Sequence, residues 1–193
     1  MNNQLPNEPQ PEPLTRVQIL AAMGVTALVL LLVARLWLVF DPTSLLTLRW
    51  VRQEIFLGIG LGFGITLASA VVYRLWPAYR RSADYYLKLV LKPLLWPDLL
   101  WMGLLPGLSE ELLFRGVMLP AIGMNLVGIV VSSLCFGVLH LSGLQQWPYV
   151  VWATLVGFLL GFSALVTGNL LVPILAHIVT NLVSSLAWKF NQP

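Results

Sequence analysis

The sequence has 193 residues, of which 58% are hydrophobic and only 10% are charged. Soluble domains are about 45–50% apolar and about 25% charged, so this composition excludes an ordinary soluble domain and indicates an integral membrane protein. The net charge of +3 is not gathered on a long basic face, which argues against nucleic-acid binding, and the single Cys135 excludes an internal disulfide.

The N-terminal part of the chain predicts a tail and two membrane spans. Residues 1–15 are rich in Pro, Asn and Gln and predict a disordered tail, and residues 16–190 then form a single membrane-embedded helical domain. We expect transmembrane helices at Val17–Phe40 and at about Glu54–Trp76. The second has two glycine pairs with the four-residue spacing found where membrane helices pack closely, Gly58 with Gly62 and Gly60 with Gly64.

The end of the second span and the connection after it carry the strongest charge signal. They hold five of the eleven basic residues, namely Arg74, Arg80, Arg81, Lys88 and Lys92. Basic residues gather in cytoplasmic connections, so we expect this one to face the cytoplasm. Within it, Tyr85–Leu95 predicts an amphipathic helix at the membrane interface.

Four more apolar runs predict four more spans, at about Leu99–Pro120, Asn125–Leu141, Pro148–Thr167 and Leu170–Lys189. Pro106 with Gly107 is expected to kink or break the first of these just before its charged motif. The run at Asn125–Leu141 is short for a span, and we expect this helix to be tilted or offset. The predicted fold is an all-α transmembrane bundle of about six spans with both termini in the cytoplasm.

The third span contains Glu110, Glu111 and Arg115, the only charged residues between Leu99 and Trp188. Each charge costs roughly 2.5–3.5 kcal/mol to insert at membrane depth, which favours a function for them. Neighbouring helical residues point about 100° apart, so the two glutamates face different ways. Glu111 can pair with Arg115 one turn away, which leaves Glu110 free as a general base. The alternative is a structural ion pair beside an inert, protonated Glu110.

Both histidines of the chain also lie in apolar spans, each with a partner four residues away on the same helix face. His140 follows Phe136, and its imidazole could bind a metal, relay a proton or orient water. His177 precedes Asn181, and together they could donate hydrogen bonds to a developing oxyanion. The alternative for each is an ordinary hydrogen bond inside the bundle.

The three motifs are, in chain order, Glu110-Glu111-x-x-x-Arg115, Phe136-x-x-x-His140 and His177-x-x-x-Asn181. In order and spacing they resemble the signature of the CAAX protease and bacteriocin-processing (Abi) family of intramembrane endopeptidases, which includes the type II CAAX prenyl endopeptidases. The resemblance covers about residues 98–190, the expected catalytic half of the chain.

The resemblance implies a role for each motif residue. Glu110 and His140 would activate a water for attack on a peptide carbonyl, and His177 with Asn181 would stabilise the oxyanion. The Glu–Arg pair would orient the motif helix, with Phe136 in support.

The resemblance also implies partners and raises the question of a cofactor. A peptide or protein substrate would be held in the lipid bilayer, and the short chain favours a bacterial-type inner or plasma membrane. Members of the family have been labelled metalloproteases, so zinc is an alternative to a metal-free glutamate mechanism. The sequence lacks the His-Glu-x-x-His pattern of soluble zinc proteases, which favours the metal-free mechanism without any metal ligand assigned.

Two other functions fit the same polar residues. A non-catalytic family member would keep them as a scaffold or partner-binding site, and a proton-coupled transporter would use Glu110 and the histidines as a relay. The sequence shows neither an inverted repeat nor paired broken helices, which argues against transport. The oligomeric state is left open.

Overall fold

A computed structural model describes residues 14–41 and 45–191, and this part of the chain is helical without any β-strand. The all-α prediction is therefore confirmed. Most of the predicted tail lies outside the described residues, but Thr15 is seen as the N-cap of the first helix. The elements are α1 (Arg16–Phe40), α2 (Arg52–Leu75), α3 (Pro77–Leu91), η1 (Trp96–Asp98), α4 (Leu99–Glu111), the π-helical η2 (Leu112–Met118), α5 (Leu119–Ile122), α6 (Leu126–Leu139), η3 (Leu144–Gln146), α7 (Trp147–Thr167) and α8 (Leu171–Phe190).

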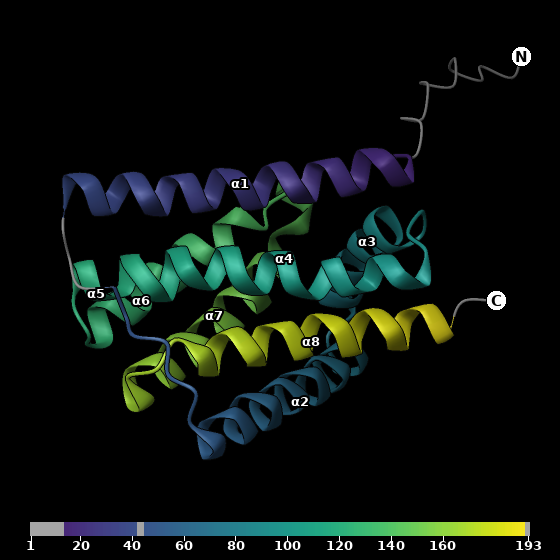
Figure 1. Cartoon of the computed structure of the whole chain (residues 1–193). Helices are drawn as coiled ribbons and strands as arrows, with labels where there is room; N and C mark the ends of the chain where they lie inside the picture. The colour runs from purple at the N-terminus through teal and green to yellow at the C-terminus, as the bar shows by residue number, and fades with distance from the viewer. Residues whose placement is uncertain (1–13, 42–44, 192–193) are drawn as a thin grey trace, which may run out of the picture.

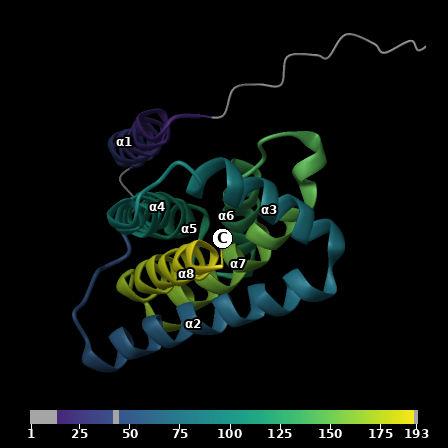
Figure 2. The ribbon, with the colours of Figure 1, turned by 90° about the vertical axis from the view of Figure 1, so that its right-hand side faces the viewer.

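Helix α8 occupies the middle of the bundle, where it packs against α2, α4 and α7 (Figures 1 and 2). Helix α6 packs against α7, and α1 lies outside α4. Helix α3 crosses one end of the bundle and contacts α2, α7 and α8. The described ends of the chain both lie at this α3 end, so the long helices run alternately away from α3 and back toward it.

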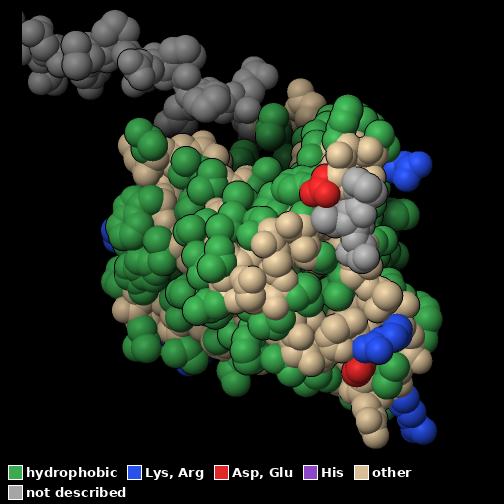
Figure 3. Space-filling view, turned by 90° about the vertical axis from the view of Figure 1, so that its left-hand side faces the viewer, with side chains coloured by type: hydrophobic (Ala, Val, Ile, Leu, Met, Phe, Trp, Pro, Cys, Tyr) green, Lys and Arg blue, Asp and Glu red, His purple; other side chains and the backbone are tan. Residues whose placement is uncertain are grey.

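The outer surface is that of a membrane protein. In the most apolar 18-residue stretch of α1 only 22% of the residues are buried, and in that of α2 only 17%. Their remaining hydrophobic side chains are therefore available to lipid. The end of the molecule opposite α3 is also mostly hydrophobic, with its charged side chains gathered along one margin (Figure 3).

Among the described residues, four helices are long and apolar enough to cross a membrane. The number becomes five if α3 and the helix from Trp96 to Ile122 form one span bent by 113°. Helix α6 is apolar but has only 14 residues, fewer than the roughly 20 that a span requires. Six spans, a tilted α6 and cytoplasmic termini therefore stay predictions.

The predicted interfacial helix at Tyr85–Leu95 is shifted, since α3 already begins at Pro77 and ends at Leu91. Proline fits the first turn of a helix because its missing N–H has no partner there, which explains the early start. Pro93 has no backbone N–H to continue the helical hydrogen bonds, which explains the early end. Helix α3 buries Tyr79 and Ala83 against the bundle and exposes its basic side chains.

Of the kink or break predicted at Pro106, the break is wrong, because α4 runs through this residue and continues into η2 and α5, and the kink stays a prediction. Proline cannot donate a backbone hydrogen bond, so the carbonyl of Met102 loses its partner within the helix. The amide of Asn181 on α8 faces that carbonyl, with its Nδ2 at 3.5 Å. The irregular part of this helix is instead the π-helical segment, which begins directly after Glu111.

An ion pair attaches α1 to the turn that precedes α4. The Arg16 guanidinium donates from Nε and Nη2 to the two carboxylate oxygens of Asp98, each at 2.7 Å. These hydrogen bonds, with one from the backbone N–H of Leu95, lower the pKa of Asp98 to about 2. The start of α1 is thus held at the α3 end of the bundle.

Candidate active site

Glu111 is the centre of a buried polar network. Its Oε1 accepts a hydrogen bond from Arg115 Nη1 at 2.9 Å, which confirms the pairing predicted from the four-residue spacing. The same oxygen lies 2.7 Å from Nδ1 of His177, on α8. Because a carboxylate accepts from a ring N–H, this contact orients the imidazole of His177. The sequence did not predict that His177 would pair with Glu111.

Arg115 is fully buried, and its other contacts lie across the bundle. Its Nη2 donates to the carbonyl of Gly157 on α7 at 2.8 Å, and its guanidinium lies 4.4 Å from the centre of the Phe136 ring. A Cβ at Gly157 would stand 3.0 Å from Arg115 Nη2 and 3.1 Å from the Phe136 ring. Gly157 is a site residue that the sequence could not reveal, since it contributes a backbone carbonyl and the absence of a side chain.

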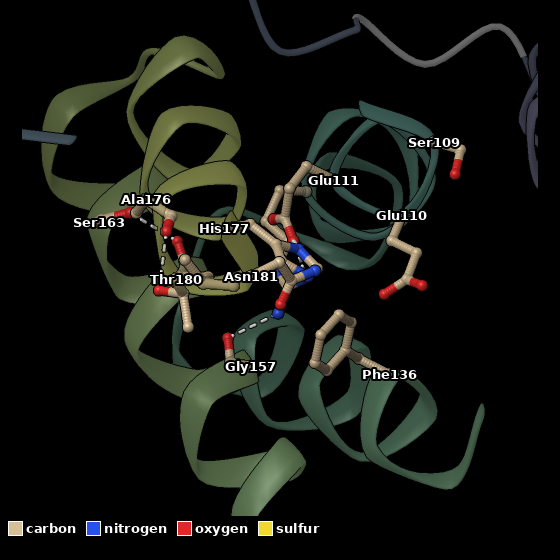
Figure 4. A network of polar contacts seen from close by, with 12 residues as sticks. Ser109, Glu110, Glu111, Phe136, Gly157, Ser163, Ala176, His177, Thr180 and Asn181 are labelled. Atoms are coloured by element: carbon tan, nitrogen blue, oxygen red, sulfur yellow. Dashed lines mark hydrogen bonds and ion pairs between the residues drawn. The ribbon is translucent and has the colours of Figure 1, made fainter. Parts of the chain in front are cut away.

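Glu110 points away from this network, as the helical geometry predicted (Figure 4). Its Oε2 lies 3.9 Å from Nε2 of His140, so the two side chains expected to act on one water do lie next to each other. Nδ1 of His140 lies 2.9 Å from the carbonyl oxygen of Phe136. A carbonyl can only accept, so Nδ1 carries the hydrogen and Nε2 faces the carboxylate.

His177 and Asn181 share one face of α8, one turn apart (Figure 4). Among the described residues, the amide of Asn181 makes only the long contact to Met102 described above, and His177 keeps its Nε2 free of the Glu111 contact. The interior hydrogen bonds considered as an alternative role are therefore present for both residues. They leave Nε2 of His177 and a second N–H of the Asn181 amide available for a further partner.

These side chains meet a cavity of about 810 Å³ between α2, α3, α4, α6, α7 and α8. His140, His177 and Asn181 all line it, whereas Glu110, which faces His140, is not among the lining residues. Much of the remaining wall is aromatic, made by Tyr79, Tyr86, Tyr149 and Trp152. The sequence does not reveal these rings as site residues, because they stand apart from the three motifs and only the fold brings them together.

The donor set does not fit a zinc site in this arrangement. A zinc site needs at least three protein ligands, and among the described residues no group of three or more His, Cys, Asp or Glu side chains could hold a metal ion. Nδ1 of His177 is already engaged by Glu111. The metal-free mechanism stays a prediction, which metal analysis of the purified, active protein tests.

Residues 92–183 match the family described as type II CAAX prenyl endopeptidase, Rce1-like. This range contains all three motifs. This part of the chain is similar to that family. The uncharacterized protein YpbD of Bacillus subtilis (strain 168) is 29% identical over 152 residues, which cover 79% of this chain and 77% of that protein. No solved structure gives a significant match.

The Rce1-like match over residues 92–183 confirms the resemblance drawn from the motifs. Together with the long apolar helices, it identifies an integral membrane protein. The matched range begins at residue 92, so α1, α2 and α3 lie outside it.

Proposed function

We propose that this chain is an intramembrane endopeptidase that hydrolyses a peptide bond in a membrane-associated peptide or protein. The observation that carries the proposal is the 3.9 Å approach of Glu110 and His140, beside a cavity and next to a buried network that holds the motif helix in place. Intramembrane charges are costly, and a family of membrane proteases supplies a use for them.

Glu110 and His140 are suited to activate a water molecule. The carboxylate of Glu110 and Nε2 of His140 are both acceptors, and one water can donate a hydrogen bond to each across a gap of this size. That orientation leaves a lone pair of the water oxygen to attack a carbonyl carbon. The water gives one proton to Glu110 as the C–O bond forms, and the protonated acid returns it to the leaving nitrogen as the C–N bond breaks.

His177 and Asn181 are suited to stabilise the oxyanion. Nδ1 of His177 contacts the carboxylate of Glu111, so Nε2 is the ring nitrogen left for the oxyanion, and it is a donor in an imidazole that carries a hydrogen on both nitrogens. The Nδ2 of Asn181 makes only a 3.5 Å contact, so it can turn to a stronger acceptor at little cost. Two such donors are what a tetrahedral intermediate of acyl transfer requires.

The test is cleavage in membranes that contain the full chain or its variants. Glu110→Gln and His140→Ala should each abolish the loss of substrate peptides seen by comparative proteomics of the membrane fraction, with expression and thermal stability retained. Cys135→Ala, an exposed change on the same α6 helix, should cleave as the wild type does. Normal biological complementation by both site variants would instead favour the scaffold function and refute the protease.

A further inference from the structure

Helix α3 contacts the candidate active site although it lies outside the family-matched residues. The hydroxyl of Tyr86, on α3, donates a hydrogen bond to the backbone carbonyl of His140. Tyr86 and His140 also line the same cavity. An element that follows the second span therefore reaches the residue that faces Glu110.

His140 lies at the C-terminus of α6, because the helix ends at Leu139 and His140 is its C-cap. The last carbonyls of a helix have no partner within it and must find one elsewhere. The N–H of His140 bonds to the carbonyl of Gly137 at 3.0 Å, but its own carbonyl lies beyond the last helical turn. The Tyr86 hydroxyl supplies the missing donor, which stops the end of α6 from fraying.

The ring of Tyr86 is itself held in place. It stacks on Tyr149 of α7, with ring centres 4.4 Å apart and an angle of 23° between the planes. Tyr149 in turn lies 6.0 Å from the imidazole of His140, centre to centre. The hydroxyl of Tyr86 thus acts on the backbone of His140, while the stacked pair bounds the space beside its ring.

We infer that Tyr86 is a positioning residue for His140, and that α3 is a working part of the active site. The inference rests on the proposed function, since it assigns Tyr86 a part in presenting His140 Nε2 to Glu110. Tyr86 acts through the backbone of His140 and touches no reacting atom. Its loss should leave substrate binding largely intact and slow the chemical step, because small misplacements of a catalytic group are costly in rate.

The experiment compares Tyr86→Phe with Tyr85→Phe in the full-length protein. The first removes one hydroxyl and keeps the stacked ring. The second is a matched control, because Tyr85 is the adjacent residue on α3, is 48% exposed and, among the described residues, makes only a ring contact. The chain has only two histidines, so histidine-selective isotope labelling gives two imidazole signals, which a His177→Gln variant assigns.

We expect Tyr86→Phe to shift or broaden the His140 signal, to leave that of His177 unchanged, and to lower kcat roughly 10- to 100-fold with little change in KM. Tyr85→Phe should change none of these. An unchanged His140 signal, or a shifted signal with an unchanged kcat, would overturn the inference. A wild-type protein without peptidase activity would refute the proposed function separately, and the His140 signal would still decide whether Tyr86 orients that residue.

Discussion

The carboxylate of Glu111 receives two hydrogen bonds on one oxygen, from Arg115 on its own helix and from His177 on α8. A buried charge is tolerable only when it is paired, so each of these groups depends on the others. Glu110, one residue earlier, has no such partner and faces His140 at 3.9 Å. The two adjacent glutamates therefore have different roles: Glu111 stabilises the fold, and Glu110 takes part in the proposed chemistry.

Glu111→Gln should destabilise the fold strongly, while Glu110→Gln should hardly change its stability. Removing the Glu111 charge leaves the fully buried Arg115 without its counter-charge, and breaking a buried pair in this way costs about 3–5 kcal/mol. Thermal unfolding of both variants in the same detergent measures the difference. Equal melting temperatures would show that the Glu111 network contributes nothing to stability.

At the scale of elements, α8 is brought to the site by glycines on its neighbours. Gly58 and Gly62 of α2 lie so close to α8 that an added Cβ would stand 2.9 Å and 2.7 Å from backbone carbonyls. Gly60 and Gly64 have nothing within 4 Å of that position. Of the two glycine pairs with the spacing expected for close packing, one makes the α2–α8 contact and the other faces outward.

Gly62→Ala should therefore weaken the bundle, and Gly64→Ala should not. The first places a methyl group against the Ala176 carbonyl, one residue before His177, so the helix that carries His177 and Asn181 must shift. The second adds a methyl group in open space and gains helix propensity of up to about 1 kcal/mol. Melting temperature and cleavage by the two variants test this. A loss of stability in Gly64→Ala would contradict the outward placement.

The whole molecule is asymmetric in charge between its two ends. Helix α3 and the described ends of the chain lie together, and the exposed basic side chains of α3 gather there. Two further basic side chains lie at the same end. Arg16 forms an ion pair with Asp98, and Lys189 donates hydrogen bonds to the carbonyls of Leu91 and Leu94. The opposite end is mostly hydrophobic (Figure 3). Such an asymmetry is typical of a protein whose basic end stays in the cytoplasm.

A reporter fused to the C-terminus should therefore report a cytoplasmic position. We expect a fused green fluorescent protein to fluoresce and a fused alkaline phosphatase to be inactive, because each works on only one side of a bacterial inner membrane. The reverse pattern would show that the orientation drawn from the basic residues is wrong. An N-terminal fusion should agree with the C-terminal one, since α1 begins and α8 ends at the same end of the bundle.

How much of the fold and of the site could be predicted from the sequence depended on how far apart along the chain the contacting residues lie. The helices, the all-α class and the Glu111–Arg115 pair follow from apolar runs and a four-residue spacing, which local helix geometry determines. Two local predictions differ from the structure: Pro106 does not break its helix, and α3 lies earlier than expected. In the first case α8 offers a partner near the carbonyl that proline leaves free, which no local pattern shows.

The sequence alone determined which residues are candidates for chemistry, because three charges and two imidazoles stand out in hydrocarbon and form three spaced motifs. Only the tertiary structure decided how they are supported. The contact of His177 with Glu111, the Gly157 carbonyl under Arg115 and the Tyr86 hydroxyl on His140 join residues 42 to 66 positions apart. Such contacts depend on how whole helices pack against one another, which the spacing within a single helix does not determine.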